Sequence, residues 1–326
     1  MIASFTTTNG QYVNLTAIKF VYYYGPETSD NETYSIEENW KILNHPFFNN
    51  SKRTTCYIHG YTESQSAESV QTIIKAYLTQ INEFNLITLD WKKLASGRYI
   101  SDAVKNALIL GDLLGEVFIR FFKNGMNLEK FHFIGHSLGA QLAGLIGRSI
   151  QRNSDGEIKI PRITGLDPAF PGFYIFPLRK ALNADDGDFV DIIHTDGLIY
   201  GAPLSIGTVD FWPNRGSFTQ PSCPKRNFKI LSENDVCSHH QAWKFWAESV
   251  TNLYNVEFFA AKALSWQDFR IRSQFMKLPL AKMGINCPKN ISGKYYLQTN
   301  PKSPFARGLD GAIYNNKLQN KIKKLN

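Results

Sequence analysis

The pentapeptide Gly135-His136-Ser137-Leu138-Gly139 carries the strongest structural signal in this chain. The run before it, Lys130-Phe131-His132-Phe133-Ile134, predicts a short buried strand, and the small-residue run after it, residues 140–148, predicts a helix. Ser137 then lies on a sharp turn from strand to helix, where the backbone is strained and residues two positions away on either side must lack bulk. Gly135 and Gly139 meet that requirement.

Apolar runs alternate with helical patterns along the rest of the chain, which predicts an α/β architecture. Strands are expected at 18–24, 54–58, 84–89, 162–166, 189–194, 208–212 and 295–297, and helices at 67–81, at 104–122 and from about His239 to Val250. A serine on a strand-to-helix turn is the nucleophile elbow of α/β hydrolases. The sequence therefore predicts the α/β-hydrolase fold, with a mostly parallel central sheet and helices on both faces. No long linker divides the chain, so a single domain over residues 1–326 is expected.

A serine hydroxyl needs a general base, and the base needs an acid that orients it. In α/β hydrolases the chain order is serine, then acid, then histidine. Asp167 fits the acid well, because it ends the expected strand 162–166 and Pro168 follows it; its rivals are Asp185, Asp186, Asp191 and Asp196. Candidate bases are His194, which ends a strand, and His239 and His240, which we expect in a loop just before a helix.

Composition limits the other possibilities. The 326 residues carry a net charge of +8, partly from the lysines of the last ten residues, and they contain no nucleic-acid-binding motif. No stretch of 18 apolar residues predicts a membrane span, and the first residues show no signal peptide. Four cysteines without a C-x-x-C pair argue against a zinc ribbon or a thioredoxin-like site. Together with sequons at Asn14, Asn31, Asn49 and Asn290, the even cysteine count favours a secreted glycoprotein.

Several stretches together resemble the pancreatic lipase family, including its insect and venom phospholipase A1 branch. They are Ile58-His59-Gly60-Tyr61, Leu89-Asp90-Trp91, Gly135-His136-Ser137-Leu138-Gly139-Ala140, Gly165-Leu166-Asp167-Pro168-Ala169, Val190-Asp191-Ile192-Ile193-His194-Thr195-Asp196, Asp210-Phe211-Trp212-Pro213-Asn214 and Cys237-Ser238-His239. They follow the family's order through most of the chain.

The resemblance implies a catalytic triad of Ser137, Asp167 and His239, with His194 not the base. It implies an oxyanion hole made by the backbone N–H groups of Tyr61 and Leu138. Tyr61 stands where the family usually has Trp or Phe, and keeps both the backbone donor and an aromatic wall.

The same resemblance bears on disulfides, metal and domains. It pairs Cys223 with Cys237 across a lid loop, and leaves the partners of Cys56 and Cys287 open. No metal or other cofactor is expected, although the family's calcium ligands would correspond to Asn183 and Asp186, which otherwise form a solvated acidic turn. No lipid-binding sandwich domain is expected after His239.

The implied function is a secreted serine hydrolase of glycerolipid esters, acting on phospholipid or acylglycerol at a lipid interface. Two loops that influence substrate choice in this family are short here: 13 residues separate Cys223 from Cys237, and ten separate Asp196 from Gly207. Short loops favour a phospholipase A1, the alternative being a neutral triacylglycerol lipase. A storage protein of the insect yolk type is disfavoured because Ser137 is present. The net positive charge is consistent with either solubility or weak attraction to a lipid interface, so peripheral contact with a membrane is one expectation.

Overall fold

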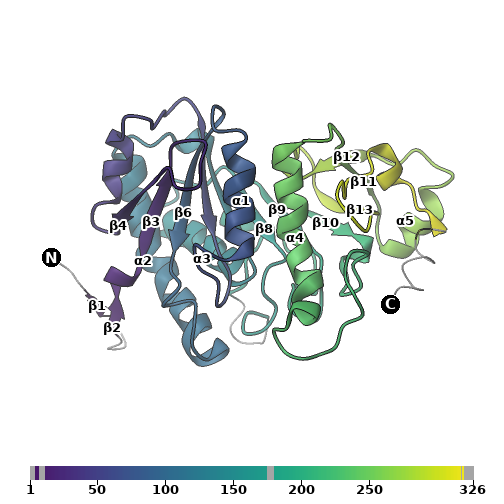
Figure 1. Cartoon of the computed structure of the whole chain (residues 1–326), viewed down its shortest axis with the longest axis horizontal. Helices are drawn as coiled ribbons and strands as arrows, with labels where there is room; N and C mark the ends of the chain where they lie inside the picture. Colours follow the sequence, from purple (N-terminus) through teal and green to yellow (C-terminus); the bar gives the residue numbers. More distant parts are fainter. Residues whose placement is uncertain (1–3, 7–11, 175–179, 317, 319–326) are drawn as a thin grey trace. The chain divides into compact units, whose positions relative to one another are not determined.

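The computed structural model describes residues 4–6, 12–174, 180–316 and 318 (Figure 1). They form two compact units. The first consists of Met1–Gly165 and Pro171–Val190, and the second of Leu166–Phe170 and Asp191–Asn326. The chain passes between the units three times: within β8, Ile163–Leu166, between Phe170 and Pro171, and within β9, Val190–Ile193. In the described part of the chain, no helix is long and apolar enough to cross a bilayer.

The first unit is built on strands in the order β4-β3-β6-β5-β7-β8. Their bounds are Lys19–Tyr23 for β3, Asn31–Ser35 for β4, Arg53–Ile58 for β5, Phe84–Asp90 for β6 and Phe131–His136 for β7. The central strand β5 runs parallel to both β6 and β7, whereas β3 is antiparallel to β4 and β6. Residues 54–58 of β5 are all buried, as expected for a parallel strand covered on both faces.

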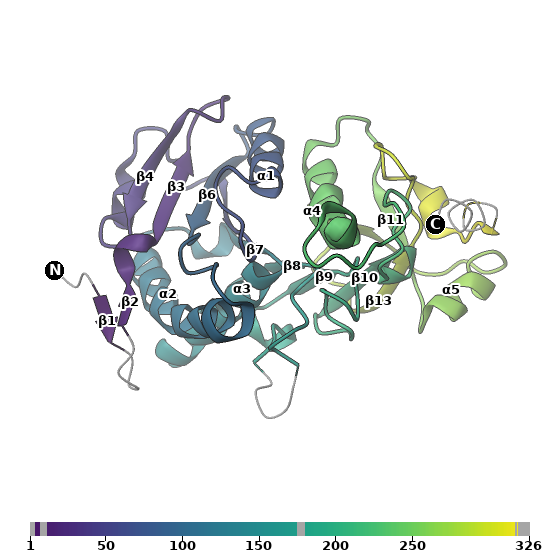
Figure 2. The same ribbon diagram turned by 60° about the horizontal axis from the view of Figure 1, so that its bottom comes forward.

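Helices cover both faces of these strands. Helix α1, Glu68–Leu78, lies on one face, while α2, Lys105–Lys123, and α3, Leu138–Asn153, lie on the other (Figures 1 and 2). In α1 the buried side chains of Val70, Ile73, Ile74 and Tyr77 recur at helical spacing, so burial of one stripe fixes the helix on the sheet. The short elements of this unit are β1 Ser4–Thr6, β2 Tyr12–Asn14, η1 Leu15–Ala17, η2 Asn39–Asn44, the π-helix η3 Tyr99–Val104, η4 Leu128–Lys130 and η5 Ala184–Asp186.

The second unit contains both parallel and antiparallel strand pairs. Strand β10, Val209–Pro213, is parallel to β9 and to β13, Gly293–Leu297. Strand β11, Phe258–Lys262, is antiparallel to β13 and to β12, Leu280–Met283. The helices are α4, Glu233–Thr251, α5, Trp266–Arg272, and the short η6, Asn214–Gly216, and η7, Leu309–Ala312.

The parallel strands, the helices on both faces and the strand–turn–helix unit at Ser137 confirm the predicted α/β-hydrolase fold. The predicted start of the helix that carries His239 is wrong. Helix α4 begins at Glu233 rather than near His239, so His239 lies within the helix and not in a loop before it. Ser232 takes the extended N-cap conformation, and Glu233 and Asp235 place negative charge in the first turn, where it interacts favourably with the helix dipole.

Candidate active site

Ser137 connects β7 to α3 with backbone angles φ 54° and ψ −118°. Non-glycine residues rarely adopt a positive φ, and such strain persists only where the surroundings enforce it. A Cβ at Gly135 would overlap the backbone of the turn itself, and one at Gly139 would overlap the backbone at the end of β5. Both glycines are therefore required for the turn that presents Ser137.

Asp167 and His239 are hydrogen-bonded in the second unit. Asp167 follows β8 with φ 45° and is fully buried. One of its oxygens, Oδ2, lies 2.6 Å from Nδ1 of His239 on α4. The other, Oδ1, accepts hydrogen bonds from the backbone N–H groups of Thr195 (2.7 Å) and Asp196 (3.1 Å). Three nitrogen atoms therefore surround the Asp167 carboxylate, which is held in one orientation toward His239.

The structure pairs Asp167 with His239 and gives the rival histidines other environments. His194 is 0% exposed, its Nε2 lies 2.7 Å from Oδ1 of Asp210, and its ring stacks on Trp212 at 3.7 Å. An imidazole enclosed in this way has no access to a substrate. The ring of His240 lies 5.8 Å from that of Trp243, on the following turn of α4.

The rival acids are likewise engaged elsewhere or exposed. Asp196 is bound by an arginine described below, Asp186 by Arg148, and Asp185 is exposed to solvent. Asp191 is buried within β9.

The proposed oxyanion donors lie on two segments that meet in the first unit. A Cβ at Gly60, on the loop after β5, would lie 3.2 Å from Cβ of Ser137, so this loop packs directly against the nucleophile turn. Tyr61 is next on that loop; its hydroxyl donates to the carbonyl of Gly97 at 2.5 Å. Leu138 is the first residue of α3, where backbone N–H groups have no acceptor within the helix.

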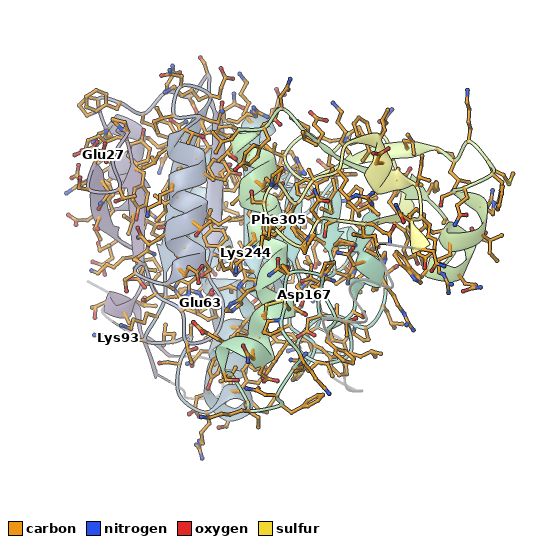
Figure 3. The ribbon with its side chains drawn as sticks, turned by 45° about the vertical axis from the view of Figure 1, so that its right-hand side comes forward. Glu27, Glu63, Lys93, Asp167, Lys244 and Phe305 are labelled. Carbon is orange, nitrogen blue, oxygen red and sulfur yellow. A yellow bond between two sulfur atoms is a disulfide. The ribbon has the colours of Figure 1, made fainter. Side chains whose placement is uncertain are left out.

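Glu63 holds this loop and was not predicted. Its Oε2 accepts from the backbone N–H of Gly60 (2.5 Å) and lies 3.4 Å from Nδ1 of His136, while its Oε1 accepts from the Ser69 hydroxyl (2.5 Å). Burial by itself raises the pKa of Glu63, but the rings of His136 and His59 and the hydrogen bond from Ser69 outweigh it and hold the pKa well below its ordinary value. Glu63 is therefore ionised where it binds the loop of Gly60. Its side chain is labelled in Figure 3.

The 13-residue loop between Cys223 and Cys237 is fastened twice. The predicted disulfide between these residues is present. Within the loop, Arg226 is buried and donates to both carboxylate oxygens of Asp196 (2.8 and 3.2 Å) and to Asp235 (2.8 Å). Burial, with the charges of Asp167 and Asp235, raises the pKa of Asp196 to about 7 against the opposing effect of Arg226. One guanidinium thus balances a cluster of buried carboxylates next to the Asp167–His239 pair.

Tyr200 completes this cluster. Its hydroxyl donates to Asp235, and its ring lies 5.6 Å from the ring of His239 and 5.1 Å from the guanidinium carbon of Arg226. The 13-residue loop is therefore linked to His239 through packed and hydrogen-bonded side chains.

The residues implied for calcium do not fit that ion. The carboxylate of Asp186 is buried and accepts from Arg148 Nε (2.9 Å) and Nη2 (3.0 Å), so its charge is already balanced. Asn183 is neutral, and its side chain caps the short helix η5. Burial raises the pKa of Asp186, against the effect of Arg148. The solvated acidic turn is also wrong for Asp186, which forms a buried ion pair instead.

A family model described as Lipase matches residues 3–305. The chain belongs to the Lipase family. Lipase member H-A of Xenopus laevis is 31% identical over 276 residues, which cover 80% of this chain and 58% of that protein. Pancreatic triacylglycerol lipase of Myocastor coypus is 31% identical over 291 residues, which cover 80% of this chain and 60% of that protein. These matches confirm the resemblance to the pancreatic lipase family. The chain spans no more than three-fifths of the length of either relative.

Solved structures are more distant from this chain. A putative hydrolase of the α/β superfamily from Xanthomonas campestris aligns with a TM-score of 0.34 and 17% identity, over 47% of this chain and 77% of its own. An esterase from Pyrococcus furiosus aligns with a TM-score of 0.30 and 18% identity, over 47% of this chain and 66% of its own.

Proposed function

We propose that this protein is a serine hydrolase of glycerolipid esters. The observation that carries the proposal is the backbone of Ser137, held at a positive φ between a parallel strand and a helix by two glycines that no other residue could replace. Membership of the Lipase family and the Asp167–His239 hydrogen bond support it. A storage protein would have no use for a strained serine, because that strain costs stability.

In the proposed mechanism Ser137, His239 and Asp167 act as a triad. Asp167 binds Nδ1 of the imidazole, so Nε2 is the nitrogen that takes the proton of the Ser137 hydroxyl as Oγ attacks the ester carbonyl. The imidazolium then protonates the departing alcohol, and water hydrolyses the acyl-enzyme by the same route. We propose that residues 1–326 act as one catalytic domain, because the three residues of the proposed triad are spread along the chain from Ser137 to His239.

The negative oxygen of the tetrahedral intermediate would be bound by the N–H groups of Tyr61 and Leu138. Loss of one such donor typically costs about 2.7–4 kcal/mol of transition-state stabilisation. Glu63 supports this role for Tyr61 because it fastens the N–H of Gly60 and so fixes the loop. A carboxylate near an oxyanion would be unfavourable alone, but the ring of His136 lies beside it.

We propose a phospholipase A1-type preference over triacylglycerol hydrolysis. The loop of 13 residues after Cys223 and the loop of ten after Asp196 cover less apolar surface than long lids would, which suits a polar head group. The name of one relative, pancreatic triacylglycerol lipase, supports the alternative of a neutral lipase. Exposed apolar side chains on the first loop, Phe228, Ile230 and Leu231, suit contact with lipid in either case.

We also propose that the protein is secreted. The Cys223–Cys237 disulfide is the kind of bond that persists in oxidising compartments. Two of the sequon asparagines, Asn49 and Asn290, are exposed and accessible to glycosylation.

The test is fatty-acid release measured side by side on phosphatidylcholine vesicles and on a triolein emulsion, with Ser137→Ala as the control. We expect faster release from phosphatidylcholine, with a lysophospholipid product that retains its sn-2 chain. Faster release from triolein would make the protein a neutral lipase and leave the triad unaffected. Full activity in folded Ser137→Ala protein would refute the mechanism itself.

A further inference from the structure

The segment 263–279, which we call the α5 excursion, connects two paired strands of the second unit. Strand β11 ends at Lys262 and β12 begins at Leu280, and the two are antiparallel with Ala261 opposite Leu280. The N–H of Lys262 donates to the carbonyl of Pro279 at 2.8 Å, so both ends of the excursion lie together. Its residues therefore project from one end of a strand pair.

The excursion is anchored by a buried cluster that it shares with β13 and with the segment around η7. Ala263, Phe269 and Leu278 are buried in a cluster with Tyr296, Ala312 and Tyr314, and Trp266 packs against that cluster. The N–H of Tyr314 donates to Oγ of Ser273 at 3.0 Å, which fastens the excursion to the segment after η7. The remaining apolar side chains are thus not needed to hold it in place.

Four large apolar side chains of the excursion point to solvent. Leu264 is 80% exposed and Phe275 is 83% exposed, and Ile271 and Met276 are more than half exposed. Phe275 and Met276 are consecutive and lie on a tight turn, where the N–H groups of both donate to the carbonyl of Arg272. A single exposed apolar residue is ordinary on a protein surface, but a group on one projecting segment marks a contact site.

The excursion is also positively charged. The excursion contains Arg270, Arg272 and Lys277 against one acid, Asp268, which pairs with Arg272. The wider segment 258–316 holds nine Lys and Arg residues and only two Asp, a net charge of +7. A second copy of this face would be repelled, whereas a negatively charged partner with an apolar interior would be attracted.

We propose that the α5 excursion is a docking surface for anionic lipid bilayers. Phe275 and Met276 would insert among the acyl chains near the head groups, while Arg270 and Lys277 would pair with lipid phosphates. The inference rests on the proposed function, because a lipid-hydrolysing enzyme has to work at such a surface. It assigns that contact to a segment separate from the Cys223–Cys237 loop and from the residues of the triad.

The experiment uses Ser137→Ala protein, so that vesicles stay intact, and measures binding by co-sedimentation. The probes are vesicles of phosphatidylcholine alone and of phosphatidylcholine mixed with phosphatidylglycerol. We expect tighter binding to the mixed vesicles. Burial of a Phe side chain corresponds to roughly a tenfold change in affinity or more, so Phe275→Ser with Met276→Ser should weaken binding at least about tenfold.

Arg270→Glu with Lys277→Glu should abolish the preference for phosphatidylglycerol. Two matched controls lie on the first unit: Phe47→Ser, at a phenylalanine 61% exposed, and Lys75→Glu, at an exposed lysine of α1. Both should bind vesicles as the parent does. Melting curves of the excursion variants should match the parent, because the buried residues of the excursion are unchanged.

The proposal is wrong if the Phe275 and Met276 variant binds like the parent, or if Phe47→Ser loses as much. It is also wrong if only the charge variant loses binding, since that result describes a site for soluble polyanions. Hydrolysis of a water-soluble ester by the same variants with Ser137 restored should equal that of the parent. If the parent hydrolyses no ester, the proposed function fails while the vesicle measurement still decides the docking surface.

Discussion

Replacing Arg226 with methionine tests how much the buried contact between this guanidinium and two carboxylates stabilises the protein. The substitution removes three charge-assisted hydrogen bonds and leaves Asp196 and Asp235 buried without their cation. Breaking a buried pair from one side typically costs about 3–5 kcal/mol, because an uncompensated charge remains. For domains of 150–250 residues 1 kcal/mol lowers the melting temperature by about 2–4 °C, so we expect a loss of roughly 6–20 °C.

The loss should depend on pH, with a sign that follows from Asp196. Its pKa is raised to about 7 in the folded protein, and removal of Arg226 raises it further. A carboxyl group whose folded pKa exceeds its unfolded value binds more protons when folded, so its ionisation destabilises the fold as the pH rises. The penalty of Arg226→Met should therefore be largest above pH 7 and shrink as the pH falls toward 5.

The measurement is calorimetry of parent and variant at several pH values, with Lys225→Met as the matched control. Lys225 is the adjacent residue of the same loop and is exposed, so its replacement should leave the melting temperature unchanged. Two results would contradict this reasoning. One is a melting temperature of Arg226→Met equal to that of Lys225→Met, and the other is a loss of melting temperature that grows as the pH falls.

Three further outcomes follow from the same structure. His239→Ala should reduce kcat nearly as far as loss of the serine does, because triad members act as a unit. His240→Ala should retain most of the activity. The reverse pattern in a hydrolysis assay would identify His240 as the base. Glu63→Gln should lower kcat more than it raises KM and should lower stability at neutral pH. Because the pKa of Glu63 is depressed, its stabilising effect is lost as the pH falls below about 4. In denaturation curves the variant should therefore lose less stability in acid than the parent does. Equal losses in acid would contradict this. Replacing Cys223 and Cys237 with serine should cost about 3 kcal/mol in urea titrations, as expected for a loop of this length, and an unchanged midpoint would show that Arg226 alone fastens the loop.

Local sequence patterns were enough to predict the strands and helices of the first unit that carry the nucleophile. Residues 54–58 and 84–89 are short stretches rich in β-branched and apolar residues, and the elements observed at Arg53–Ile58 and Phe84–Asp90 differ by one residue at an end. The outer strands β4 and β11 and the helix α5 were not predicted. Strand β4 has the sequence NETYS, which is largely polar and is held by pairing with β3 rather than by burial. Strand β11 and helix α5 were missed because the apolar residues of 258–280 are divided between a buried cluster and solvent, which blurs both periodicities.

Some residues of the candidate site could likewise be predicted from the sequence, and others could not. Ser137 and Asp167 follow from their positions at the ends of strands, and His239 follows from the resemblance. Glu63 and Arg226 leave no signal in the sequence, because each is a charged residue in a polar loop and such residues are usually exposed to solvent. What makes them important is long-range: Glu63 meets His136, which is 73 residues away, and Arg226 meets Asp196, which is 30 residues away.

The two fastenings of the Cys223–Cys237 loop limit how far it can reach. Arg226 and Asp235 are joined at 2.8 Å, so the eight residues 227–234 form an arc with both ends fixed. Such an arc must go out and return, and at about 3.5 Å per residue it extends at most about 14 Å. That is about half the thickness of a bilayer's hydrocarbon core. The exposed Phe228, Ile230 and Leu231 can therefore reach the acyl chains of the nearer leaflet only, and the loop can follow a lipid surface without swinging away from His239 as a hinged flap would.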